Sequence, residues 1–144
     1  MTATRSRKEE ITYRTHQSKQ KNTGCVFCHI KKGHDQFISE HTYFIVIRNI
    51  FEYSIWDGQK VVDHLMLVPK KHTDSLGELP TGAAEEFVKI ISAYEKKSYN
   101  IYARAPLSVI KSVVHQHTHL IKTVGRPKNF VFLLRKPLYV RLVT

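Results

Sequence analysis

The hydrophobic and polar positions along the chain first mark out short strands. Runs rich in β-branched and aromatic residues are typical of strands, and turn-forming residues separate them. The stretch Trp56–Gln59 indicates a turn because Gly58 can adopt a positive φ without strain. Pro69 ends the run before it, since proline cannot donate to a strand ladder. The pattern predicts strands over residues 43–48, 61–68, 98–103, 112–121, 129–134 and 138–143.

One long helix is predicted between the second and third of these strands. Thr81 follows Pro80 and is a suitable N-cap. The helical spacing i, i+3, i+4, i+7 produces a single apolar stripe, formed by Ala83, Ala84, Phe87, Ile90, Ile91 and Tyr94. The charged residues that take the other face are Glu85, Glu86, Lys89, Lys96 and Lys97. Several strands with one long helix predict an α+β domain with a mostly antiparallel sheet of about five strands.

The first 24 residues differ from the rest of the chain. They carry Arg5, Arg7, Lys8, Arg14, Lys19 and Lys21 against only Glu9 and Glu10. Apolar residues are few there and show no clear period, which is typical of a mobile basic tail. The predicted organisation is therefore a tail over residues 1–24 and one domain over residues 25–144.

Charge and composition narrow the function classes. The chain of 144 residues has a formal net charge of +11, which favours anionic partners such as nucleotides or nucleic acid, although solubility alone is an equally good explanation. No apolar run approaches the roughly 18 residues of a membrane span, and the polar N-terminus does not resemble a secretory signal. Its two cysteines form a C-x-x-C pair, typical of metal or redox sites in a reducing compartment. These features together predict a cytoplasmic protein.

Three histidines at alternate positions, His115, His117 and His119, are the most informative feature. Side chains on a strand alternate between faces, so this spacing places the three imidazoles in one row and points Gln116 and Thr118 the other way. A solvated row of histidines is the bland alternative. Alternate strand residues lie about 6.5–7 Å apart, which disfavours one shared metal ion. We therefore expect one end histidine to bind a metal, the middle one to attack, and the last to handle protons.

Three motifs, in this order, resemble the histidine triad (HIT) superfamily. The first is Cys25-Val26-Phe27-Cys28, similar to the N-terminal motif of zinc-bearing members. The second runs from His64 to His72 and resembles the characteristic strand-to-helix segment of the superfamily. The third is the histidine row. The motifs span about residues 25–122, and by this resemblance the chain is identified as a member of the zinc-bearing branch.

The resemblance implies a catalytic role for the row. His117 would attack the α-phosphorus of a nucleotide conjugate and form a nucleotidyl-histidine intermediate, as a neutral imidazole can at pH 7. His119 would assist charge stabilisation or proton transfer. Ser112 matches a hydroxyl that contacts the phosphate. The resemblance also implies a nucleotide pocket, with Asn49 on the ribose hydroxyls and His64 in support. Ile47, Ile50 and Phe44, with Phe51 nearby, would line the pocket for the nucleotide base. Packing in the core explains each of these residues, taken alone, just as well.

The loop before the histidine row departs from the superfamily's pattern. Ile110-Lys111 stands where Gly-Gln is usual, and Arg104 replaces an upstream asparagine. Residues 105–109 lack the glycines that let backbone N–H groups approach a phosphate. Lys111 and Arg104 either supply full charges in place of those dipoles or leave the site impaired.

A structural zinc site is expected at Cys25 and Cys28, whose spacing lets both thiolates reach one ion. The resemblance implies that His72 and His115 complete the tetrahedral set. Nearby alternatives as ligands are His29, His34 and His41. A redox role for the cysteine pair is less favoured because no βαβ pattern follows it.

Two functions therefore stand at this point. The first is a HIT-type hydrolase or transferase acting on nucleoside phosphoramidates, dinucleoside polyphosphates or an adenylylated acceptor. The second is a catalytically weak HIT-fold module that binds a nucleotide or nucleic acid, held by the basic C-terminal residues Lys122, Arg126, Lys128, Arg135, Lys136 and Arg141. The resemblance also implies a homodimer.

Overall fold

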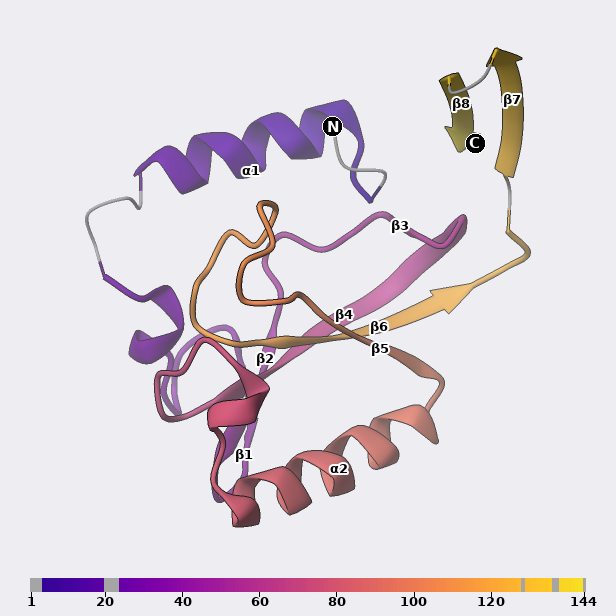
Figure 1. Ribbon diagram of the computed structural model, residues 1–144. Helices are drawn as coiled ribbons and strands as arrows, with labels where there is room; N and C mark the ends of the chain where they lie inside the picture. The colour runs from indigo at the N-terminus through magenta and orange to yellow at the C-terminus, as the bar shows by residue number, and fades with distance from the viewer. Residues whose placement is uncertain (1–3, 20–23, 128, 136–137, 144) are drawn as a thin grey trace.

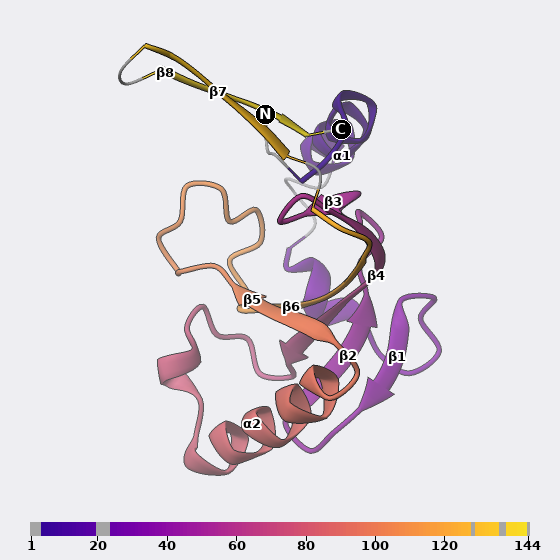
Figure 2. The same ribbon diagram turned by 90° about the vertical axis from the view of Figure 1, so that its right-hand side faces the viewer.

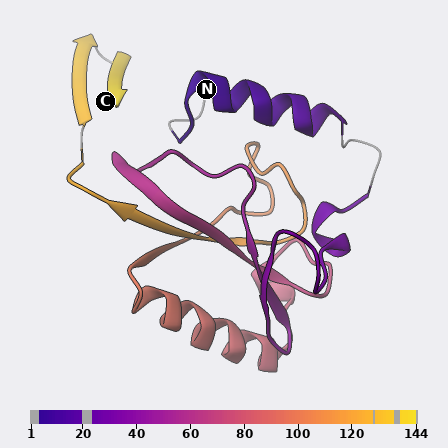
Figure 3. The same ribbon diagram turned by 180° about the vertical axis from the view of Figure 1, so that it is seen from behind.

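The architecture is a twisted antiparallel sheet with one helix on each side of it (Figures 1 and 3). The computed structural model describes residues 4–19, 24–127, 129–135 and 138–143, and its side chains over residues 4–6, 8–16 and 24–127. The strands of the main sheet are β1 (Phe37–Glu40), β2 (Phe44–Arg48), β3 (Ile55–Trp56), β4 (Gln59–Pro69), β5 (Tyr99–Ala103) and β6 (Thr118–Val124). Their order is β1-β2-β4-β6-β5, and β3 pairs with β4. The predicted α+β class with an antiparallel sheet is confirmed.

Two further strands, β7 (Asn129–Arg135) and β8 (Leu138–Val143), form a separate antiparallel pair beyond the end of β6 (Figure 2). Both were predicted from the sequence. The predicted turn after Trp56 is also confirmed, and it joins β3 to β4. Asp57 (φ 48°) and Gly58 (φ 75°) are both left-handed, as a two-residue hairpin turn requires.

The predicted helix is α2 (Thr81–Glu95), which covers one face of the sheet (Figure 1). It begins one residue differently from the expectation: Pro80 occupies the N-cap position, and Thr81 is already helical. Most of the apolar stripe packs as predicted, with Ala83 and Ile90 buried against strand residues such as Phe44 and Leu67. Ala84 is the exception, because it is exposed. Glu86 does not simply face solvent, because its carboxylate accepts hydrogen bonds from the backbone N–H groups of Thr42 and Tyr43 (2.9 and 2.7 Å).

The predicted strand over residues 112–121 is wrong in its first half. The ladder of β6 begins only at Thr118, which pairs with Leu67 and Ala103. Just before it, the backbone N–H of Gln116 donates to the Thr73 carbonyl (2.7 Å), so the chain is fastened to the segment after β4 instead of to a neighbouring strand. His115 and His117 therefore lie on a buried loop that leads into the sheet, and only His119 is in a strand.

The described residues 4–19 of the expected N-terminal tail are mostly helical, whereas its mobility stays a prediction. Residues Arg7–Lys19 form helix α1, which lies on the side of the sheet away from α2 (Figures 1 and 3). Ser6 and Glu9 form a capping box: the Ser6 N–H donates to the Glu9 carboxylate (2.7 Å), and the Glu9 N–H donates to the Ser6 hydroxyl. The Thr4 carbonyl accepts the backbone N–H of Ser54 (3.0 Å), which fixes the start of the segment to the domain.

No helix in the described part of the chain has both the length and the apolar character that a membrane crossing needs.

Candidate functional site

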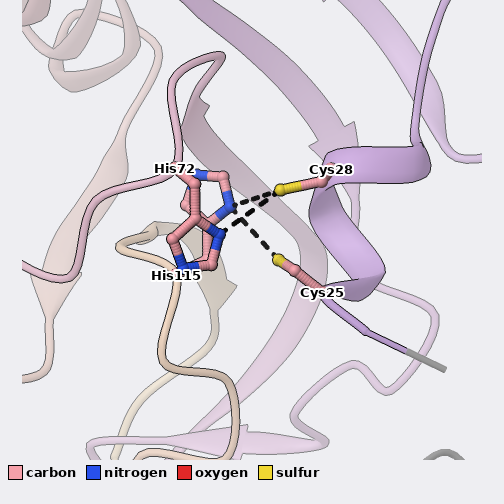
Figure 4. Close-up of side chains that lie close together, drawn as sticks. All are labelled: Cys25, Cys28, His72 and His115. Carbon is pink, nitrogen blue, oxygen red and sulfur yellow. Dashed lines mark hydrogen bonds between the residues drawn. The ribbon is translucent and has the colours of Figure 1, made fainter. Parts of the chain in front are cut away.

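Four potential metal ligands converge beside the sheet (Figure 4). Cys25 and Cys28 belong to the 3-10 turn η1 (Val26–His29) and its N-cap, His72 follows β4, and His115 precedes β6. Their ligand atoms all lie within 4.8 Å of one another. His115 Nδ1 is 3.3 Å from the Cys25 sulfur and 3.5 Å from the Cys28 sulfur, and His72 Nδ1 is 3.3 Å from the Cys28 sulfur.

The geometry of this group fits a tetrahedral ion. With Zn–S near 2.3 Å and Zn–N near 2.0 Å, a tetrahedral site separates sulfur from nitrogen by about 3.5 Å, close to the three observed separations. His115 Nε2 lies 2.9 Å from the Pro69 carbonyl oxygen and must carry the hydrogen that it donates. The lone pair of His115 is therefore on Nδ1, the atom that faces both sulfurs. Burial and the neighbouring Cys25 raise the pKa of the Cys28 thiol.

The four residues are those that the resemblance implied. Within the described ranges, the group that could hold an ion contains none of His29, His34 and His41, which were alternative ligands. η2 (Leu76–Glu78) follows His72 in the chain, and Thr73 between them receives the Gln116 hydrogen bond. Cys25 and Cys28 lie before the first strand, and His115 lies on the loop that carries the histidine row. The cluster therefore joins the start of the domain to that loop.

His117 is buried with its ring fixed by the backbone. Its Nδ1 lies 2.9 Å from the carbonyl oxygen of His115, so Nδ1 carries the hydrogen and Nε2 keeps a free lone pair. Burial lowers the pKa of His117 to about 4, and this outweighs the opposite effect of that hydrogen bond. The Phe27 ring packs edge-on at 5.1 Å between centroids. The arrangement presents a neutral imidazole nitrogen at pH 7.

His119 and His64 form a buried chain next to it. The Tyr53 N–H donates to His64 Nδ1 (3.1 Å), so the His64 hydrogen is on Nε2 and is donated to His119 Nδ1 (2.9 Å). His119 must then carry its own hydrogen on Nε2. Burial is the largest cause that lowers the pKa of His64 to about 3 and that of His119 well below its ordinary value. His119 is therefore a neutral N–H donor beside His117, with ring centroids 5.0 Å apart.

A cavity of about 1030 Å³ opens on this side of the sheet. His117 and His119 line it, together with the metal-ligand group and the loop over residues 109–114. Its opposite wall comes from the α1 segment and includes Arg5, Tyr13 and His16. The cavity has the size of a typical small-molecule site and brings polar groups together over an apolar floor.

The other residues of the expected phosphate site also line the cavity, but they differ in exposure and in hydrogen bonding. Ser112 is exposed and lines the cavity. Lys111 lines it too, but its ammonium donates to the Asp74 carbonyl and to the Gln116 side chain (2.9 Å each), which ties it down. Arg104 lines the cavity and donates to the Tyr53 hydroxyl (3.2 Å).

The expected nucleotide-binding residues divide between the two faces of β2. Phe44 is fully buried in the core beneath α2 and does not line the cavity, so its assignment to the base pocket is wrong. Strand alternation is the reason, since Phe44 and Ile47 face opposite ways. Ile47 is on the correct face but is fully buried in the cluster with Phe27, beneath the cavity surface. Ile50 lines the cavity and is 55% exposed.

Asn49 also lines the cavity, but its side chain is largely engaged inside the protein. Its Oδ1 accepts the Phe51 N–H (3.0 Å), and its amide nitrogen contacts His64 (3.2 Å to Nε2). Arg5 and Tyr53 are among the cavity residues that the sequence did not predict. The signal for Arg5 was the Ser6–Glu9 capping box, which marks a helix start directly after it.

The basic C-terminal group is only partly described. Lys128 and Lys136 lie outside the described residues, as do the side chains of Arg135 and Arg141. Of the remaining two, the Lys122 ammonium lies 5.6 Å from the centre of the Tyr99 ring, and Arg126 is exposed.

The chain is similar to several solved structures. No family model matches it, and no curated protein matches it. A HIT family hydrolase from Clostridium thermocellum is 23% identical with a TM-score of 0.54, and the match covers 71% of this chain and 92% of that one. A HIT family hydrolase from Legionella pneumophila Philadelphia 1 is 21% identical with a TM-score of 0.50, and the match covers 78% of this chain and 97% of that one. A zinc-bound histidine triad family protein from Mycobacterium smegmatis is 22% identical, with a TM-score of 0.54, over 71% of this chain and 76% of that one. The chain therefore has the fold of the histidine triad proteins.

Proposed function

We propose that this protein is a nucleotide hydrolase or nucleotidyl transferase that acts at the α-phosphorus of a nucleotide conjugate. The observation that carries the proposal is the state of His117. Its Nδ1–H is held by the His115 carbonyl, and its Nε2 is left unprotonated on the wall of the cavity. A neutral imidazole fixed in this way is an activated nucleophile. The fold agrees with this proposal, and two of the proteins with similar structures are named as hydrolases.

The proposed reaction has two displacements. In the first, the Nε2 lone pair of His117 forms a bond to the α-phosphorus, and the bond from phosphorus to the leaving group breaks. His119 Nε2–H donates a hydrogen bond that stabilises the leaving nitrogen or oxygen, and a leaving nitrogen takes its proton from solvent. The His117 ring becomes positively charged, and the His115 carbonyl stabilises this charge through Nδ1–H. In the second displacement, water or an acceptor hydroxyl attacks phosphorus, and the N–P bond breaks with its electron pair returning to His117 Nε2. The proton of the attacking water or hydroxyl is released to solvent.

The test is turnover of adenosine 5′-phosphoramidate by wild-type protein and by the His117→Ala variant. His34→Ala is the matched control because His34 is exposed and does not line the cavity. We expect His117→Ala to lose at least about 10³-fold in kcat and the control to keep its rate. Turnover by His117→Ala within tenfold of the wild-type rate would contradict the mechanism.

We also propose that Cys25, Cys28, His72 and His115 hold a structural zinc ion. Two observations support this: the sulfur–nitrogen separations, and the lone pair on His115 Nδ1, which faces both sulfurs. Bound zinc would fix the loop whose carbonyl, at His115, orients His117. Metal analysis of protein purified without added metal should give about one equivalent of zinc, and Cys28→Ser should lower it while His29→Ser should not. Less than about half an equivalent in the wild-type protein would refute the site.

A second candidate function is nucleotide or nucleic-acid binding without significant turnover. The engagement of the Lys111 ammonium by Asp74 and Gln116 favours it, because this cation is not free to bind a phosphate. A binding module would take up nucleotide with wild-type affinity in His117→Ala and show no turnover in either protein. If it holds a nucleic-acid backbone, the affinity will fall steeply with salt; a flat response would exclude that partner.

We further propose a cytoplasmic homodimer. β5 ends the strand order of the main sheet, and an edge strand is a natural place for pairing with a second copy. Light scattering on the purified protein should give twice the mass of one 16.8 kDa chain, and a monomer mass would refute it. Cell fractionation tests the compartment, and recovery with the membrane or secreted fraction would contradict it.

A further inference from the structure

The α1 segment delivers a guanidinium to the wall of the reaction cavity. Arg5 lines the cavity, and its Nη2 donates to the Phe51 carbonyl (2.9 Å). Its guanidinium carbon lies 4.3 Å from the centre of the Tyr13 ring and 4.8 Å from that of Tyr53. Two aromatic rings thus hold the group in place. Its Nε is buried and, within the described chain, has no hydrogen-bond partner.

A second guanidinium reaches the same tyrosine from the loop after β5. Arg104 Nη2 donates to the Tyr53 hydroxyl (3.2 Å), and its guanidinium lies 5.3 Å from the centre of the Tyr102 ring. Tyr53 in turn packs on His119, with ring centroids 5.5 Å apart. Two arginines from distant parts of the sequence are therefore gathered around one aromatic ring, at the His119 end of the cavity.

Within the described part of the chain, neither arginine forms an ion pair within 4 Å, although Arg5 contributes to the lowered pKa of the Glu9 carboxyl. Among the described residues, the ion pairs within 4 Å involve Arg14, Arg48 and Lys70 as cations, and neither Arg5 nor Arg104. The positive field extends to the catalytic row, since both arginines contribute to the lowered pKa of His119. A buried Nε without a partner and two unpaired cations on a cavity wall together call for an anionic ligand.

We propose that Arg5 and Arg104 form a subsite for a phosphate in the leaving group, so that the preferred substrates are nucleotides joined through a phosphoanhydride. This inference rests on the proposed function, in which His117 takes the α-phosphate. In the first displacement the bond between the α-phosphorus and the bridging oxygen breaks, and the electron pair goes to the leaving phosphate. The two guanidinium groups stabilise the charge that develops there. A leaving amine takes a proton from solvent and departs as a neutral molecule, so the two guanidinium groups contribute little to its departure.

The two leaving-group classes therefore separate the roles. Diadenosine triphosphate releases a phosphorylated leaving group, and adenosine 5′-phosphoramidate releases ammonia. We expect Arg5→Gln and Arg104→Gln each to lower kcat/KM for diadenosine triphosphate about tenfold or more, as loss of a charge-assisted hydrogen bond does. For the phosphoramidate we expect a clearly smaller loss, because its leaving ammonia carries no phosphate that could contact the two guanidinium groups. Lys8→Gln is the control, because Lys8 is an exposed α1 cation that does not line the cavity.

The variants also distinguish a subsite from a structural role. If Arg5 only holds α1 in place, Arg5→Gln will lower both activities equally, and that result overturns the proposal; unchanged activity on both substrates overturns it as well. Arg104→Gln gives an independent test because Arg104 lies outside α1. Circular dichroism and thermal unfolding confirm that each variant is folded.

Failure of the proposed function has its own signature. If the wild-type protein turns over neither substrate, the subsite is still tested by comparing the affinities for ADP and AMP. The β-phosphate should strengthen binding to the wild-type protein by about tenfold, and this ratio should approach one in Arg5→Gln and Arg104→Gln. An ADP to AMP ratio that is the same in the wild-type protein and both variants would overturn the proposal.

Discussion

Replacement of His64 by glutamine should remove one proton's share of the acid sensitivity of the fold. His64 is fully buried at the junction of β4 and β6, where it accepts the Tyr53 N–H and donates to His119. Both of its ring nitrogens are used in the neutral form, and a second proton would have to displace the Tyr53 hydrogen bond. Burial in this position lowers the pKa of His64 from 6.5 to about 3.

The sign of the effect follows from proton binding. Below pH 6.5 the unfolded chain binds a proton at His64 that the folded chain does not bind until about pH 3. Stability from this residue is therefore fully present above pH 6.5 and is lost progressively as the pH falls toward 3. Between pH 7 and pH 4.5 the loss amounts to about 2–3 kcal/mol in the free energy of unfolding.

The assay is urea unfolding at a series of pH values, with the metal content held equal in all proteins. Relative to the wild-type protein, His64→Gln should flatten the dependence of unfolding free energy on pH by about 1.4 kcal/mol per pH unit near pH 5. His34→Gln is the control, because His34 is an exposed histidine, and it should leave the slope unchanged. Equal slopes in the wild-type protein and His64→Gln would refute the assigned hydrogen-bond pattern.

Three further predictions concern the fold and the cavity wall. Leu67→Ala should lower the unfolding free energy by about 2–5 kcal/mol, because Leu67 is 1% exposed between the sheet and α2; in urea unfolding, Leu107→Ala at a 95% exposed site should cost less than about 0.5 kcal/mol. Ser6→Ala should cost about 1 kcal/mol of α1 stability by removing its cap, seen as faster amide exchange confined to α1, and unchanged exchange would contradict the capping box. Lys111→Met should leave the buried Gln116 oxygen without its donor and lower thermal stability by about 1–3 kcal/mol, whereas an unchanged melting temperature would show that this contact is dispensable.

Short-range pattern and motif spacing were sufficient for much of the fold and for two of the four metal ligands. The apolar stripe on α2 and the turn at Asp57–Gly58 are local features, so the sequence displays them directly. Cys25 and Cys28 show their chemistry by spacing. His72 and His115 came only from the resemblance, because nothing local pairs residues 43 positions apart; the structure brings them together.

The features that the sequence did not predict depend on tertiary contacts. The start of β6 is decided by the Thr73 carbonyl, which takes the Gln116 N–H out of any ladder. The position of Phe44 depends on which face of β2 meets α2. α1 has little apolar periodicity. Polar and aromatic contacts such as those of Arg5 hold it on the domain, and the sequence of the helix does not predict these contacts.

The central claim is that His117 forms a covalent bond to the nucleotide. The most direct measurement is rapid mixing of wild-type protein with excess adenosine 5′-phosphoramidate, acid-free quenching within milliseconds, and intact-mass spectrometry followed by peptide mapping. We expect a transient increase equal to one adenylyl group, mapped to His117, and no increase in His117→Ala. Turnover at the normal rate without any adduct, or an adduct that persists in His117→Ala, would contradict it.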